Sequence, residues 1–349
     1  MTFRRIEIEN LRCLSAAAWE PAEGLSLIVG ANGAGKTSVL EAIALVATGR
    51  VLRSGGVGGA RQRGTGKMRV TAEYGAGLEQ TVVGYESGAG GRMWRMDGIP
   101  QKSALGIVQR IPIMVLSPDA HYVALQDAMA RRAATHWALF HVEPLFLDTW
   151  RRYQRILRQR NAALRQGDPV YRMFDQGLAQ IGTSLFGFWE NLYHHIAGRV
   201  QHYAGRLGLE GAVRVVLRCP WAGRGLEEAL RAEYVADERL GYTQIGPHRL
   251  DVRFQLDGHA LQAVGSHGQQ KVVLSAWRLA LAEHVAQGGK RPTLLVDDVP
   301  AELDRVRREA FFRLLAECGA QAMATATEVP PDLPHATTVF HVEQGRFPL

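Results

Sequence analysis

The sequence predicts an α/β protein in which a nucleotide-binding fold is interrupted by an inserted helical lobe. Three features predict it: a glycine-rich loop between an apolar strand and a helix, a later apolar strand that ends in two aspartates, and a long glycine-poor stretch between them. We expect residues 1–120 and 210–349 to form the nucleotide-binding domain and residues 121–209 to form the helical lobe.

The glycine-rich loop carries the motif G-x-x-x-x-G-K-[ST], which is typical of a phosphate-binding loop. Its residues are Gly30, Ala31, Asn32, Gly33, Ala34, Gly35, Lys36 and Thr37. Glycines let backbone N–H groups converge on phosphate oxygens, and the helix that follows directs its positive end at the same anion. The motif therefore predicts nucleotide binding, with Lys36 on the β- and γ-phosphates and the Thr37 hydroxyl on Mg²⁺. The alternative is a glycine-rich connection that only resembles such a loop.

Composition sets the class of protein. The chain has 349 residues, 46% of them hydrophobic and 21% charged, which is typical of a soluble globular protein. Its three cysteines show no C-x-x-C spacing, so we expect a reducing cytoplasm and no structural zinc. No apolar run approaches the 18 or so residues that span a membrane. The net charge of +7 suits a polyanionic partner, although charge alone leaves nucleic-acid binding at even odds.

The first 120 residues have the pattern of strands around one helix. Residues 36–48 form the predicted helix, and residues 54–66 are expected to be a flexible basic loop. Strands are expected at residues 3–11, 25–29, 68–74, 80–86, 92–97 and 111–116.

From about Val123 to Tyr203 apolar and aromatic residues recur at helical spacing, which predicts about three long helices with a break near Gly167. Arginines lie between the apolar positions: Arg131, Arg132, Arg151, Arg152, Arg155, Arg158, Arg160 and Arg165. They form either a solvated face or a track for phosphates, and the sequence does not decide between these.

The last third returns to strands and helices. A strand is expected at 212–217, a helix at 226–236 and a hairpin turn at Asp257–Gly258. The apolar strand 293–296 ends in Asp297 and Asp298, and acids at the carboxyl end of a parallel strand face the ligand crevice. We expect Asp297 to hold Mg²⁺ opposite Thr37, and Asp298 to orient or deprotonate the attacking water. Upstream, Ser266 begins the segment S-x-G-Q and is either a plain N-cap or part of a second anion site.

Taken together, these segments resemble the ABC-type ATPases of the SMC class, and most closely the RecF family of bacterial recombination mediators. The resemblance covers nearly the whole chain. Its most specific pieces are residues 30–38, 158–164, 246–249 (Gly-Pro-His-Arg), 266–271 and 295–304. It implies an ABC/SMC-type ATPase head with the helical lobe as a short arm.

The resemblance also implies a composite active site. Residues 30–38, including Ser38, would bind ATP, and the partner's Ser266, the partner's Gly268 and the partner's Gln269 would cap its γ-phosphate. Two copies would then form a homodimer with ATP, whereas ADP would release it. Lys36 and Asp298 would be catalytic. Relatives of this kind bind gapped DNA and single-strand/double-strand junctions, and promote RecA loading with RecR and RecO in DNA repair and replication.

Two departures from the pattern bear on activity. Many ABC ATPases carry a glutamate where this chain has Asp298, which suits a slow, DNA-stimulated ATPase. No switch histidine ends the strand at 321–327, and the sequence does not decide whether Thr327 takes its place as a weaker γ-phosphate sensor. The alternatives are a transporter-type nucleotide-binding subunit and an ATP-gated scaffold that does not hydrolyse ATP. GTP is disfavoured because the chain has no N-K-x-D motif.

Overall fold

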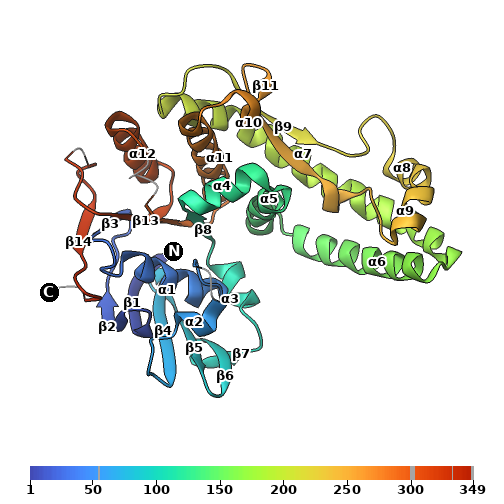
Figure 1. Cartoon of the computed structure of the whole chain (residues 1–349). Coiled ribbons are helices and arrows are strands. Elements are labelled where there is room, and N and C mark those ends of the chain that lie inside the picture. Colours follow the sequence, from blue (N-terminus) through green and yellow to red (C-terminus); the bar gives the residue numbers. More distant parts are fainter. Residues whose placement is uncertain (54–55, 299–302, 332, 347–349) are drawn as a thin grey trace. The chain divides into compact units, whose positions relative to one another are not determined.

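The chain forms two compact units (Figure 1). The structure is a computed structural model that describes residues 1–53, 56–298, 303–331 and 333–346. The first unit contains residues 1–122, 206–208 and 285–349, and the second contains residues 123–205 and 209–284. No helix in these described ranges is long and apolar enough to cross a membrane.

Two sheets make up the first unit. One is antiparallel, with strand order β2-β1-β4-β5-β6-β7. Its strands are β1 (Thr2–Leu11), β2 (Leu14–Trp19), β4 (Lys67–Ala76), β5 (Glu79–Gly88), β6 (Gly91–Met96) and β7 (Ile99–Gln101). The other is wholly parallel, with order β14-β3-β13-β12-β8. Its strands are β3 (Leu25–Val29), β8 (Ile113–Leu116), β12 (Thr293–Val296), β13 (Gln321–Ala326) and β14 (Thr338–His341).

Helix α1 (Lys36–Thr48) joins the two sheets into one core. It contacts strands of both sheets, and twelve of its residues are buried, which agrees with its apolar sequence on all sides. Three other helices belong wholly to this unit: α2 (Gly56–Ala60), α3 (Leu105–Arg110) and α12 (Arg305–Glu317). The predicted strands and the 36–48 helix are confirmed. The basic loop expected at 54–66 is wrong in part, because Val57 and Ala60 are buried and residues 56–60 form α2.

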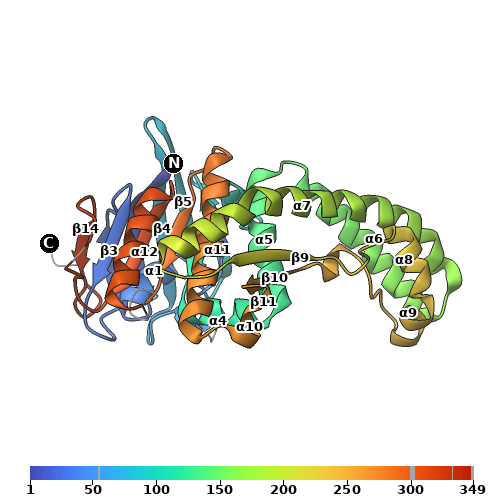
Figure 2. The same cartoon turned by 90° about the horizontal axis from the view of Figure 1, so that it is seen from above.

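Three long helices dominate the second unit: α5 (Ala128–Val142), α6 (Phe146–Gln166) and α7 (Asp175–Arg206), with α6 and α7 side by side in both views (Figures 1 and 2). Gly167, in the left-handed region at φ 68°, ends α6 as expected. The other elements are α4 (Pro118–Gln126, which begins in the first unit), η1 (Pro169–Phe174), β9 (Val213–Arg218), α8 (Leu226–Ala232), α9 (Tyr234–Leu240), η2 (Pro247–Arg249), β10 (Asp251–Leu256), β11 (His259–Ala260), α10 (Leu261–Val264) and α11 (His267–Gln287, which ends in the first unit). The single helix expected at 226–236 is wrong, since Glu233 separates α8 from α9.

Buried ion pairs explain why residues 209–284 group with the long helices. Arg131 on α5 makes two hydrogen bonds, at 2.8 and 2.9 Å, to the carboxylate of Asp251 on β10. Arg160 on α6 donates to Asp175 on α7 and to Asp237 on α9, at 2.8 and 2.6 Å. Compact units need not coincide with functional domains, so the assignment of residues 1–120 and 210–349 to one ATPase domain stays a prediction.

Candidate nucleotide site

The phosphate loop lies between the buried strand β3 and the start of α1, as the motif predicts. Two positions of the loop, Gly30 and Gly35, have no room or no favourable backbone conformation for a side chain. Gly35 has φ 111°, a left-handed conformation that side chains disfavour, and a Cβ on Gly30 would lie 2.3 Å from the Val342 carbonyl oxygen. The Lys36 ammonium donates to the carbonyl oxygens of Gly30 and Ala31 at 2.9 and 3.1 Å. The lysine is therefore held against the loop where a phosphate would bind.

Asp297 contacts the end of the phosphate loop through a hydroxyl group, and Asp298 follows it in the chain. Thr37 Oγ1 donates to Asp297 Oδ1 at 2.9 Å, although 260 residues separate them in sequence. Burial raises the pKa of Asp297, while the bonds from Thr37 and Thr325 act in the opposite direction. Asp298 follows at φ 53°, a strained region that Asp tolerates better than most residues.

Thr325 on β13 joins the two acids, and sequence reasoning missed it. Its hydroxyl donates to Asp297 Oδ1 at 3.0 Å and accepts the Asp298 backbone N–H at 3.0 Å. β13 lies between β3 and β12, and Ala324 pairs with Val296, so Thr325 stands beside Asp297. Thr327, the candidate for a sensor, is exposed one residue beyond the end of β13. Its role stays a prediction.

A buried carboxylate on α1 positions two further arginines that the motifs did not indicate. Glu41 is fully buried and accepts two hydrogen bonds from Arg12, at 2.7 and 2.9 Å. It also accepts the backbone N–H groups of Leu52 and Arg53 at 3.2 and 3.3 Å. Glu41 is five residues beyond Lys36 on a helix that is buried on all sides, so its need for a cationic partner was a signal in the sequence.

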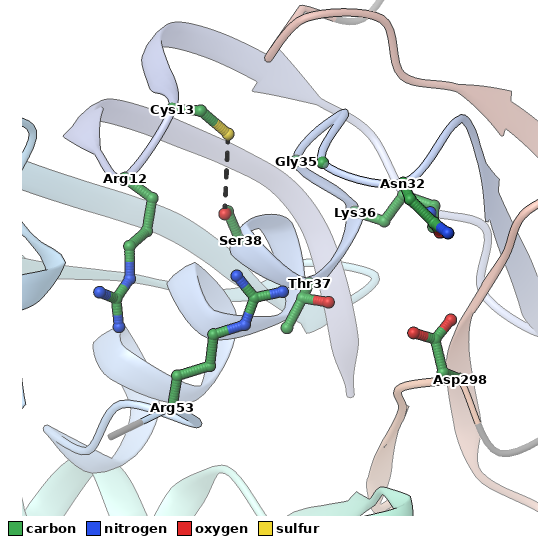
Figure 3. A pocket seen from close by; sticks show the side chains of 10 residues that line it. Arg12, Cys13, Asn32, Gly35, Lys36, Thr37, Ser38, Arg53 and Asp298 are labelled. Atoms are coloured by element: carbon green, nitrogen blue, oxygen red, sulfur yellow. Dashed lines mark hydrogen bonds between the residues drawn. The ribbon is translucent and has the colours of Figure 1, made fainter. Parts of the chain in front are cut away.

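The phosphate loop, the first turn of α1, Arg12, Arg53 and Asp298 line one cavity of about 440 Å³. Figure 3 shows Arg12 and Arg53 on one side of it, the loop and the first turn of α1 along it, and Asp298 across from Thr37. Cys13 also lines it, with its thiol 3.8 Å from the Ser38 hydroxyl. Lys36 and the two arginines supply positive charge, and the loop supplies backbone N–H groups, which together suit a polyphosphate.

The cavity region also fits Mg²⁺. Magnesium in phosphate-transfer sites takes oxygen ligands from one or two carboxylates, hydroxyls and the phosphates themselves. Thr37 Oγ1 and Asp297 Oδ1 are such oxygens and are already in contact. No cluster of three or more His, Cys, Asp or Glu side chains in the described ranges could hold a metal without the nucleotide.

The predicted capping segment belongs to the second unit. Ser266 precedes α11 and is exposed; its backbone N–H donates to Gln269 Oε1 at 2.8 Å, and its hydroxyl accepts the Gln269 N–H at 3.3 Å. This reciprocal pair is a capping box, so Ser266 is an N-cap as one interpretation held. Gly268 lies in the first turn of α11. Of the segment 295–304, residues 299–302 lie outside the described residues, while Asp304 caps α12 through the Arg307 N–H at 2.9 Å.

A phosphate loop after a parallel strand, with acids at the end of a nearby strand, defines the first unit as a phosphate-loop ATPase fold. DNA replication and repair protein RecF of Thioalkalivibrio sulfidiphilus is 32% identical over 99% of this chain and 98% of that protein. The protein with the same description from Xanthomonas axonopodis pv. citri is 35% identical over 98% of this chain and 97% of its own length. The chain therefore belongs to the RecF family of DNA replication and repair proteins.

Solved structures confirm the fold. The recombination mediator protein RecF–ATP of the RecFOR pathway matches with a TM-score of 0.84 at 21% identity, over 99% of this chain and 97% of that one. An Smc head bound to the C-terminal winged-helix domain of ScpA matches with a TM-score of 0.63 at 14% identity, over 99% and 96%. A family model described as an AAA domain matches residues 5–86. The expected ABC/SMC-type ATPase head is thus confirmed.

Proposed function

We propose that the protein binds Mg²⁺-ATP in the cavity beside the phosphate loop and hydrolyses it slowly. The observation that carries the proposal is the set of hydrogen bonds linking Thr37, Asp297, Thr325 and Asp298 at one edge of the parallel sheet. These bonds support the proposal because they link two hydroxyls and two aspartates beside the loop that would hold the phosphates.

Lys36, Thr37 and the two aspartates have distinct roles in the proposal. Lys36 exchanges the carbonyl oxygens of Gly30 and Ala31 for the β- and γ-phosphate oxygens, a stronger charge-assisted contact. Thr37 and Asp297 would hold Mg²⁺, which would neutralise developing negative charge on the phosphates. Asp298 orients or deprotonates the attacking water, and its aspartate side chain is one methylene shorter than glutamate, which suits slow turnover.

The nucleotide is also proposed to form part of a dimer interface. The Ser266 hydroxyl accepts the Gln269 N–H, which leaves its own proton free to donate to a phosphate oxygen. With Gly268 and Gln269 at the positive end of α11, it would cap the γ-phosphate of ATP held by a second copy. ATP then favours the dimer, and ADP, which lacks that phosphate, favours the monomer.

The proposed partner is DNA, and the proposed location of the protein is the cytoplasm. Family membership favours DNA repair over the transporter-type alternative, and the net charge of +7 suits a polyanion. Gapped duplex and single-strand/double-strand junctions are the proposed substrates, with RecR and RecO as protein partners and RecA loading as the outcome. An ATP-gated scaffold that never hydrolyses ATP is the remaining alternative.

Two measurements test the proposal. Phosphate release with and without gapped duplex decides between an ATPase and a scaffold: turnover that rises with DNA supports the proposal, and no turnover contradicts it. The proposed dimer interface is tested by light scattering of the Ser266→Arg variant with ATP. This variant should bind ATP yet stay monomeric. Ser184→Arg, at another exposed serine of the second unit, is the matched control and should dimerise like the parent. A Ser266→Arg protein that still dimerised would contradict the composite site.

A further inference from the structure

The eight arginines that the sequence left undecided fall into different environments in the second unit. Arg131 and Arg160 are buried in ion pairs and stabilise the fold, and Arg132 donates to the Leu250 carbonyl oxygen at 3.3 Å. Arg152 is exposed on a different side of α6 from the rest. The remaining four are exposed and form what we name the arginine stripe: Arg151, Arg155, Arg158 and Arg165.

The arginine stripe is one straight face of α6. At 3.6 residues per turn its members fall within an arc of about 80°, and they extend for about 21 Å along the helix axis. The opposite face of the helix is buried, including Tyr153 and Leu157. The stripe is therefore presented to solvent by a helix that is fixed on its other side.

Internal ion pairs do not neutralise this face. α6 contains six arginines and one acidic residue, Asp148, whose carboxylate lies 3.8 Å from Arg151. Within the part of the chain that the structure describes, Arg155, Arg158 and Arg165 have no acidic partner within 4.0 Å. Solvated helix faces elsewhere in the protein do have such pairs, as between Arg231 and Glu227 on α8. Like charges one turn apart destabilise a helix, so an anion from outside would stabilise the stripe.

An exposed aromatic side chain lies beside the carboxyl end of the stripe. A Cβ on Gly241 would lie 3.3 Å from Arg165 Cγ, and the Thr243 N–H donates to Asn161 Oδ1 at 2.9 Å, so residues 241–243 run along the last turns of α6. Tyr242 is 40% exposed, and the guanidinium of Arg249 lies 5.6 Å from its ring centroid. A basic row with an adjacent aromatic ring is the combination that single-stranded nucleic acid uses, through phosphate contacts and base stacking.

We propose that the arginine stripe is a DNA contact surface that binds consecutive phosphates of one strand, with the Tyr242 ring available to an unpaired base. This rests on the proposed function only in taking DNA as the partner. A strand of duplex carries one phosphate per 3.4 Å of axis, so a row of about 21 Å is long enough for all four arginines to reach phosphates. The contact reads no sequence, because it is made to the backbone.

The test is the salt dependence of binding to a gapped duplex, measured by fluorescence anisotropy. The stripe variant changes Arg151, Arg155, Arg158 and Arg165 to Gln. The matched control changes four other exposed arginines of the same unit to Gln, with the same loss of charge: Arg152, Arg214, Arg218 and Arg224. Because all eight side chains are exposed, both variants should melt no lower than the parent and keep its ATP turnover without DNA.

The stripe variant should lower the slope of log Kd against log salt by about 3 to 4 and weaken binding on the order of 10³-fold near 0.1 M salt. The control should keep most of the parent's slope. Tyr242→Leu should weaken binding to the gapped duplex by about 5- to 100-fold and leave the affinity for a blunt duplex unchanged. Equal slopes for the stripe variant and the parent would overturn the inference while leaving the ATPase proposal intact. A parent protein that bound no DNA at all would instead overturn the proposed function.

Discussion

Thr325→Val isolates the hydroxyl that links the two aspartates. Valine keeps the shape of the fully buried side chain and removes two hydrogen bonds of 3.0 Å, one to the Asp297 carboxylate and one from the Asp298 N–H. A hydrogen bond to a charged group contributes about 1.5–3 kcal/mol. If the bond to the charged Asp297 carboxylate holds the two acids in place for Mg²⁺ and the attacking water, turnover should fall by about 10- to 150-fold. The Thr325 bond also opposes the raised pKa of Asp297, so its loss should raise that pKa further.

The assay is steady-state ATP turnover, with the Kd of a fluorescent ATP analogue measured in parallel. The Kd should change by much less than kcat, because Lys36 and the loop are untouched. Thr338→Val is the matched control, since Thr338 is an exposed threonine on β14 of the same sheet, and it should keep the parent's turnover. If Thr325→Val retained full turnover, or if Thr338→Val lost as much, the account of this edge of the sheet would be wrong.

Four further results are expected. Lys36→Ala should lower the affinity for ATP by at least about 100-fold in a nucleotide titration, because charge-assisted hydrogen bonds to phosphate are stronger than neutral ones. Retained affinity would contradict the assignment of the loop as the phosphate site. Asp298→Asn should bind ATP, hydrolyse it slowly and accumulate as dimer in light scattering, whereas unchanged turnover would remove Asp298 from its role. Glu41→Ala should lower the free energy of unfolding by about 3–5 kcal/mol in urea, because it leaves Arg12 and two backbone N–H groups without their acceptor; a loss below about 1 kcal/mol would show that the pair is not structural. Burial lowers the pKa of His248 to about 4, so the unfolded chain takes up a proton below about pH 6.5 that the folded chain does not. Stability should be full above pH 6.5 and fall as the pH drops to 4, by up to about 3 kcal/mol from this group, and His248→Gln should show a shallower fall.

Local patterns in the sequence were enough to predict the loop, its flanking strand and helix, and the strand that ends in Asp297. Each of these depends on residues close in sequence: apolar runs, glycines at fixed spacing and acids at a strand end. The parallel sheet followed from them, and the contact between Thr37 and Asp297 is where the motif predicts it. The family resemblance, which the relatives confirm, rested on the same short segments.

What the sequence did not predict depends on pairing over long distances. Thr325 stands beside the two acids because of the register of β13 against β12, which the sequence of either strand alone does not show. Arg12 and Glu41 meet because β1 and α1 pack together, which neither segment encodes alone. The row of arginines looked uniform in sequence, and only burial separated Arg131 and Arg160 from the exposed stripe.

The most direct test of the composite site mixes two inactive variants. Lys36→Ala lacks a working phosphate loop but keeps Ser266, whereas Ser266→Arg keeps the loop but cannot cap a partner. Neither should dimerise with ATP alone, and an equimolar mixture should form a heterodimer with one complete site, seen as a rise in mass by light scattering that ADP does not produce. A mixture that stays monomeric with ATP, while the parent protein dimerises, would show that the nucleotide is not shared between two copies.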